Sequence, residues 1–202
     1  MTNSHQIVAL CLLLCACGAP TSPASEPPAA QQPKLPEQSG PKGEALPAAT
    51  VSAVVALDGE GLRLVTANGS TALLAFDRNR QETIAALSGA LGPPVGQSAN
   101  SECGAGPTDF VDWGNGLSVL IMQDRFVGWS LDPEAAGGLT TMNGIGVGSS
   151  RAALVQAFSD TSIEESTLGQ EFTAGGLSGL LDSARPDARI EALWAGTACV
   201  FR

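Results

Sequence analysis

Histidine and lysine are nearly missing from this sequence, so glycines, carboxylates and cysteines are the residues that could do chemistry. Glycines alternate over residues 144–148, just before a helix-like run, as they do in phosphate-binding loops. A dinucleotide-binding loop, however, needs a third glycine where Ser149 stands, and a P-loop needs a lysine, which the chain lacks after Lys42. We therefore predict that the glycines form a turn, that Ser149 or Ser150 caps the following helix, and that no nucleotide binds.

Acid–base catalysis in this chain would depend on carboxylates. The single histidine, His5, lies close to the N-terminus, which excludes Ser-His-Asp and Cys-His catalysis and the usual zinc sites from the rest of the chain. Asp109, Asp112 and Asp124 flank a series of predicted strands, but the first two are three residues apart and would face opposite sides of a strand. We interpret all three as solvated charges, and we predict no enzymatic activity, no metal and no cofactor. A secreted hydrolase or hydrolase inhibitor that acts through carboxylates is the alternative.

Two of the five cysteines are predicted to form a disulfide. Cys11 and Cys15 belong to an N-terminal apolar run and Cys17 directly follows it, which leaves Cys103 and Cys199. Two cysteines in an exported domain usually pair. A redox or metal site is the alternative, but it would need a CxxC spacing or a nearby histidine, and Cys103 and Cys199 have neither.

The N-terminus has the features of an export signal over residues 1–16. The apolar run at residues 7–16 has the length of a signal-peptide core and is too short to span a bilayer. It leads into LCACG, residues 14–18, which resembles the lipobox of bacterial lipoproteins. The resemblance implies cleavage before Cys17 and diacylglyceryl modification of its thiol, and a glycine after this cysteine is similar to lipoproteins of the outer membrane in Gram-negative hosts. An ordinary signal peptide cut near Ala19, which releases a secreted protein, is the alternative.

A tether and one domain follow the signal. Residues 17–50 are rich in Pro, Ala, Ser and Gln and lack aromatics, so we expect a semi-extended tether. The remaining residues, 51–202, have the length of one domain. The net charge is −10 and both lysines lie in the tether, which disfavours nucleic acid and anionic lipid headgroups as partners of the domain.

The first half of the domain reads as strands, a helix and more strands. Short strands are predicted up to Phe76. A helical pattern follows, with Ile84, Leu87 and Leu91 on one face, and Gly92 ends it. Hairpin turns then separate three predicted strands at residues 110–113, 117–122 and 126–131.

The second half repeats this order. A helix with Leu154, Val155 and Phe158 facing inward is followed by strands at residues 169–172, 177–182 and 190–195. When the halves are overlaid, Arg80 meets Arg151, Ile84 meets Val155, and GLSVLI at 116–121 meets GLSGLL at 176–181. We predict an α+β domain of two helix–β-meander units, about residues 51–133 and 140–202, with the helices on one face of an antiparallel sheet.

Tandem units of one helix and several antiparallel strands resemble the repeats of β-lactamase-inhibitor-like proteins and of small SmpA-type outer-membrane lipoproteins. The resemblance implies protein binding or envelope assembly instead of catalysis, and it assigns no functional residue. Burial is the default for tryptophans on strands; alternatively, Trp113 or Trp129 lies on an open sheet face and forms a binding surface with Arg125. We predict a lipid-anchored cell-envelope protein that binds another protein or the envelope.

Overall fold

The computed structural model describes residues 53–131 and 138–199 of the chain. The predicted signal peptide, the proposed lipidation site Cys17 and the predicted tether lie outside the described residues. Within the described ranges, no helix is long and apolar enough to cross a membrane.

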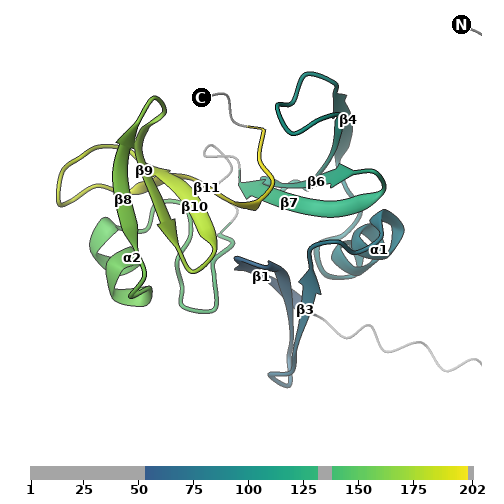
Figure 1. Cartoon of the computed structure of the whole chain (residues 1–202). Helices are drawn as coiled ribbons and strands as arrows, with labels where there is room; N and C mark the ends of the chain where they lie inside the picture. Colours follow the sequence, from purple (N-terminus) through teal and green to yellow (C-terminus); the bar gives the residue numbers. More distant parts are fainter. Residues whose placement is uncertain (1–52, 132–137, 200–202) are drawn as a thin grey trace, which may run out of the picture. The chain divides into compact units, whose positions relative to one another are not determined.

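A small sheet of three antiparallel strands opens the domain (Figure 1). It consists of β1 (Ala53–Asp58), β2 (Gly61–Thr66) and β3 (Thr71–Ala75), joined in chain order. Leu57, Leu62 and Leu74 are register partners across the three strands, so they share one face, and that face is buried in the core. Gly61 begins β2 with a φ of 150°, and a Cβ there would lie 2.2 Å from the carbonyl oxygen of Leu74, so the close approach of β3 requires glycine.

A larger sheet contains eight antiparallel strands. Its spatial order is β4 (Gly96–Asn100), β5 (Thr108–Asp112), β6 (Leu117–Met122), β7 (Arg125–Leu131), β11 (Ile190–Gly196), β10 (Leu177–Leu181), β9 (Gly169–Ala174) and β8 (Ser162–Ser166). Two groups of four consecutive strands therefore meet where β7 pairs with β11, as Figure 1 shows.

One short helix precedes each group of four strands. The first is α1 (Arg80–Leu91), whose N-terminus is capped by the side chain of Asn79 and which ends at Gly92, as predicted. The second is α2 (Arg151–Ala157), capped by the side chain of Ser150, one of the two caps that the sequence indicates. The glycines before α2 form the predicted turn: Gly144 and Gly148 have φ values of 77° and 84°, which glycine adopts without strain.

The predicted α+β class is wrong. The described residues are mostly β, with 48% strand and 13% helix, and they form two antiparallel sheets of three and eight strands and two short helices. The sequence patterns did not reveal the edge strands β4 and β8, because GQSAN and SIEES are mostly polar and show no apolar alternation. The second helix is also shorter than its pattern suggested, and Val155, expected to face inward, is 51% exposed.

Both sheets and both helices contribute to one hydrophobic core. Leu62 of the small sheet, Leu87 of α1, Leu154 of α2 and Trp129 and Leu193 of the large sheet are all fully buried within one cluster. Because both sheets and both helices bury apolar side chains in the same cluster, the two sheets stabilise each other.

The structure contains the disulfide that the sequence predicts. Cys103, in the connection between β4 and β5, is bonded to Cys199, which follows β11. The bond links positions 96 residues apart, and it ties one edge region of the large sheet to the end of its central strand.

Candidate interaction surface

The two tryptophans of the predicted binding surface are core residues. Trp113 is 3% exposed, and its indole nitrogen donates to the carbonyl of Gly92 at 3.0 Å, at the end of α1. Trp129 is fully buried, and its indole nitrogen donates to two carbonyls of the small sheet, those of Asp58 and Gly61, at 3.1 and 2.7 Å. Burial, the default expectation for both tryptophans, is therefore correct, and the alternative surface of Trp113, Trp129 and Arg125 is not present.

Arg125 lies on the surface without either tryptophan. It begins β7, and its side chain is 54% exposed. Its Nη1 atom donates to the carbonyl of Asp77 at 3.0 Å, and its Nε atom lies 4.0 Å from the carboxylate of the same residue. The structure therefore places Arg125 beside the segment that leads into α1.

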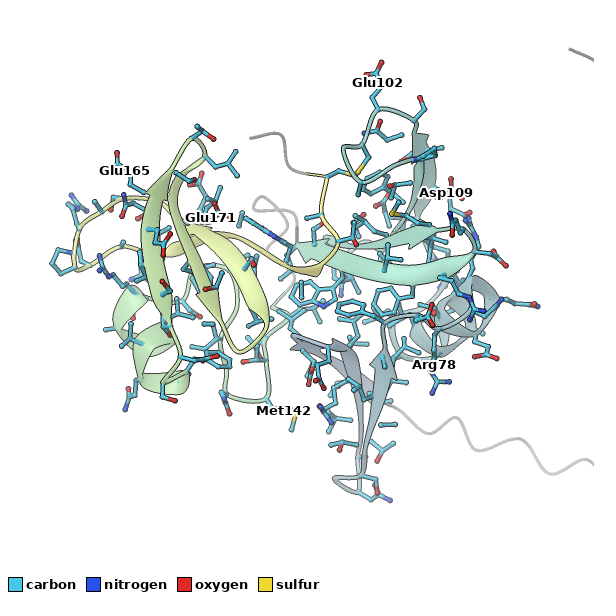
Figure 2. The ribbon with its side chains drawn as sticks, viewed as in Figure 1. Arg78, Glu102, Asp109, Met142, Glu165 and Glu171 are labelled. Carbon is cyan, nitrogen blue, oxygen red and sulfur yellow. A yellow bond between two sulfur atoms is a disulfide. The ribbon has the colours of Figure 1, made fainter. Side chains whose placement is uncertain are left out.

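The carboxylates considered for catalysis have separate partners. Asp109, which is labelled in Figure 2, pairs with Arg80 of α1 at 2.5 Å. Asp112 accepts a hydrogen bond from Ser118 on the next strand at 2.7 Å, and Asp124 accepts one from the side chain of Asn79 at 3.4 Å. Within residues 53–131 and 138–199, no three His, Cys, Asp or Glu side chains gather in a way that could hold a metal ion.

The outer edge of the large sheet, at β8 and β9, is acidic. Glu164 of β8 lies directly opposite Glu171 of β9, and Figure 2 shows Glu165 and Glu171 on these two strands. Like charges in directly opposed positions weaken strand pairing, but charge on an edge strand also prevents pairing with another molecule. We interpret this edge as protected against aggregation.

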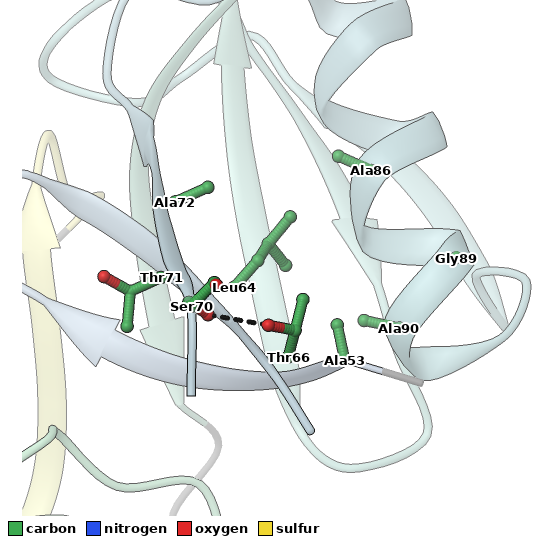
Figure 3. Close-up of a pocket in the computed structure, with 9 residues that line it drawn as sticks. All are labelled: Ala53, Leu64, Thr66, Ser70, Thr71, Ala72, Ala86, Gly89 and Ala90. Atoms are coloured by element: carbon green, nitrogen blue, oxygen red, sulfur yellow. Dashed lines mark hydrogen bonds between the residues drawn. The ribbon is translucent and has the colours of Figure 1, made fainter. Parts of the chain in front are cut away.

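An apolar groove lies between α1 and the small sheet (Figure 3). Its volume is about 320 Å³. Its lining consists of small aliphatic, glycine and hydroxyl residues: Ala53, Leu64, Thr66, Ser70, Thr71, Ala72, Ala86, Gly89 and Ala90. None of these side chains carries a charge.

The groove exists because both of its walls have small side chains. On α1, Ala86, Gly89 and Ala90 follow the i, i+3, i+4 spacing that places residues on one helix face. On the sheet, Leu64 and Ala72 are register partners and share the face turned to the helix. This spacing was the available signal in the sequence, but the opposing wall comes from strands that precede α1 in the chain and could not be inferred from it.

The rim of the groove is held by the β2–β3 hairpin. The hydroxyl of Thr66 donates to the carbonyl of Ser70 at 3.0 Å, which is the dashed line in Figure 3, and the Ser70 N–H donates to the side chain of Asn68 at 3.0 Å. These local bonds fix the turn, so the sheet wall is set before any ligand is bound.

A second depression lies on the outer side of α2. Its volume is about 550 Å³, and it is lined by Arg151, Ala152, Val155, Gln156 and Pro186. Pro186 belongs to the connection between β10 and β11, which is longer than the corresponding two-residue turn between β6 and β7. The lining of the depression therefore combines apolar side chains with the amide of Gln156 and the guanidinium group of Arg151.

Comparison of the chain with protein-family models, curated proteins and solved structures gave no match in any of the three. The resemblances to bacterial lipoproteins and to β-lactamase-inhibitor-like and SmpA-type repeats therefore stay predictions from the sequence. The function has to be argued from the residues of this chain.

Proposed function

We propose that the protein is a lipid-anchored component of the bacterial cell envelope whose domain binds another protein and has no enzymatic activity. If the host is Gram-negative, the membrane is the outer membrane. The observation that carries the binding role is the uncharged, preformed groove between α1 and the small sheet. The anchor rests on the lipobox-like LCACG at residues 14–18, and the Cys103–Cys199 disulfide agrees with an exported location.

The groove suits the apolar side chains of a protein partner. Its volume of about 320 Å³ is at the small end of the range of ligand sites, roughly 300–1,000 Å³, so it accommodates one or two side chains. Ala86, Gly89 and Ala90 let a partner approach the helix backbone closely, and burial of apolar surface is the driving force for such contacts.

The lipid anchor predicts an all-or-none labelling result. Cells that express the wild-type chain should incorporate radiolabelled palmitate into it, whereas a Cys17→Ala variant should incorporate none, because the thiol is the proposed acylation site. The label is measured on the immunoprecipitated protein, with Cys11→Ala as the control variant that keeps Cys17. Equal labelling of wild type and Cys17→Ala would contradict the anchor.

If the groove binds the partner, a larger side chain inside it should reduce crosslinking to that partner. A photoreactive residue at Thr71, on the exposed rim, should capture the partner in cells. Gly89→Leu should reduce the captured yield about tenfold, because the new side chain occupies the groove and overpacking a contact costs about 1–3 kcal/mol. Gly89 is exposed and a Cβ there meets no atom within 4 Å, so the new side chain starts in open space.

Ala85→Leu is the matched control for the groove. Ala85 lies on α1 but is exposed and does not line the groove, so its leucine variant should capture as much partner as the wild type. A similar loss in both variants would indicate a general effect on α1 and would contradict binding in the groove.

A further inference from the structure

In each half of the domain, the start of the helix is bonded to the start of the last strand of the four-strand group in an equivalent way. Asn79 and Ser150, the N-caps of α1 and α2, form matching antiparallel bridges with Arg125 and Arg189. The N–H of the first helical residue also donates in the same way in each half: Arg80 to the carbonyl of Asp124, and Arg151 to that of Ala188. Arg80 therefore corresponds to Arg151, and Arg125 to Arg189.

The segments just before the two helices also make equivalent hydrogen bonds. The N–H of Asp77 donates to the carbonyl of Phe126, and the N–H of Gly148 donates to that of Ile190. Arg125 and Arg189 then each donate from Nη1 to the carbonyl of the equivalent residue, at 3.0 Å for Asp77 and 2.8 Å for Gly148. Asp77 and Gly148 also share a positive φ, 69° and 84°, so they are counterparts.

The strands extend the correspondence to Asp109. GLSVLI and GLSGLL lie on β6 and β10, and their last residues are Ile121 and Leu181. Asp109 is the register partner of Ile121, and Gln170 is the register partner of Leu181. Gln170 therefore occupies the place that Asp109 has in the first half.

The two halves differ in charge around these arginines. In the first half, Asp109 pairs with Arg80 at 2.5 Å and Asp77 lies 4.0 Å from Arg125, while Asp124 adds a third carboxylate at the same turn. In the second half, none of the three counterparts carries a charge: Gln170, Gly148 and Ala188.

Arg151 and Arg189 consequently have no salt bridge, unlike every other arginine within residues 53–131 and 138–199. Each has one Nη1 atom fixed by a backbone carbonyl, that of Ala184 for Arg151 at 3.1 Å and that of Gly148 for Arg189. The nearby acids have other partners. Asp187 pairs with Arg185, and Asp182 accepts from the backbone N–H of Arg189.

Apolar side chains lie next to Arg151. Arg151 lines the depression on α2 together with Ala152, Val155 and Pro186. Val155 is 51% exposed, whereas its counterpart Ile84 on α1 packs against the core. The second half therefore has two arginines without a salt bridge and one exposed aliphatic side chain, Val155, whereas the first half pairs the equivalent arginines with carboxylates and packs Ile84 against the core.

We propose that Arg151, Arg189 and the depression on α2 bind a protein segment that presents a carboxylate beside an aliphatic side chain. This inference rests on the proposed protein-binding function and adds a second contact site to it. A guanidinium group bonds a carboxylate through two parallel N–H donors. Because each guanidinium group is already bonded to a backbone carbonyl, its side chain loses less conformational freedom when a ligand binds. The net charge of −10 disfavours polyanions such as nucleic acid or an anionic membrane, but it leaves a local site for a single carboxylate.

The test uses two fluorescent peptides and the full-length protein in detergent micelles. One peptide has a single glutamate beside a leucine among otherwise neutral residues, and its twin carries glutamine in place of that glutamate. Anisotropy titrations at low salt should show that the wild type binds the glutamate peptide at least tenfold more tightly than the glutamine peptide, because only the former makes charge-assisted hydrogen bonds. Equal affinity for both peptides would overturn the proposal.

The repeat supplies the decisive variant, Gly148→Asp. It installs the carboxylate that the first half has at Asp77, where the same backbone conformation is adopted, and a Cβ at Gly148 meets no atom within 4 Å. This variant should lose about tenfold in affinity for the glutamate peptide, and Arg151→Gln should lose as much. Arg125→Gln, the counterpart in the first half, should bind as tightly as the wild type.

Three results would count against the site. They are unchanged affinity in both Gly148→Asp and Arg151→Gln, an equal loss in Arg125→Gln, and Arg151-dependent binding of vesicles that contain 30% anionic lipid, which would assign the arginines to a headgroup. Failure here is separable from failure of the proposed function, because partner capture through the groove depends on α1 and is measured with Gly89→Leu.

Discussion

Removal of the Cys103–Cys199 disulfide is expected to lower the free energy of unfolding by about 4–5 kcal/mol. The bond closes a loop with a sequence separation of 96 residues, which includes most of the domain. A crosslink between such distant positions removes much of the conformational freedom of the unfolded chain, and the stabilisation grows with the logarithm of the loop length. The expected loss is a large part of the 5–15 kcal/mol that is typical of a folded domain.

Denaturant titration of the purified protein, with and without a reducing agent, measures this effect. The double variant Cys103→Ser/Cys199→Ser is the control, since it should have the stability of the reduced wild type and should not respond to the reducing agent. The slope of the transition should rise on reduction, because the reduced unfolded chain exposes more surface. If oxidised and reduced wild type unfold at the same denaturant concentration, the disulfide does not stabilise the domain.

The parts of the fold that could be predicted from the sequence are those with local signals. Gly92 and Ser150 mark a helix end and a helix start through their own backbone and side-chain chemistry, and both are found where expected. The hairpin strands β6 and β7 are short runs rich in apolar residues on both sides of a tight turn, which is also a local pattern.

The predicted class failed where structure depends on partners distant in sequence. The strands β4 and β8 carry polar residues, and they are strands only because β5 and β9 offer them backbone partners. The separate small sheet likewise depends on its pairing, β1 to β2 and β2 to β3, and on the apolar face it turns to the core. Periodicity within single segments contains neither piece of information.

The candidate sites show the same limit. Arg80 and Arg151 could be aligned from the sequence, but their different surroundings could not, because Asp109 reaches Arg80 from a strand 29 positions away. The charge difference between the halves becomes visible only when strand register identifies Gln170 as the counterpart of Asp109. A repeat that looks uniform along the chain therefore contains two chemically different surfaces.

Trp129 is the second residue for which a large effect is expected, and the effect concerns stability and not binding. Trp129→Ala should lower the free energy of unfolding by about 3–5 kcal/mol, because it empties a fully buried site in the shared core. Trp129→Phe keeps most of the apolar contact but removes the indole N–H, which leaves the carbonyls of Asp58 and Gly61 without that donor. We expect this variant to lose about 1–3 kcal/mol.

Chemical unfolding of both variants, followed by peptide and partner binding under native conditions, separates the two roles that a strand tryptophan can have. Trp113→Phe is the control, since it removes a single bond, to Gly92, and should be destabilised less than Trp129→Phe. An exposed binding anchor would behave in the opposite way, with normal stability and lost affinity. The indole of Trp129 bonds only to carbonyls inside the domain, on both sides of the β1–β2 turn. We therefore expect the folded Trp129→Phe variant to bind its partner as the wild type does. A loss of binding without a loss of stability would return Trp129 to the interaction surface.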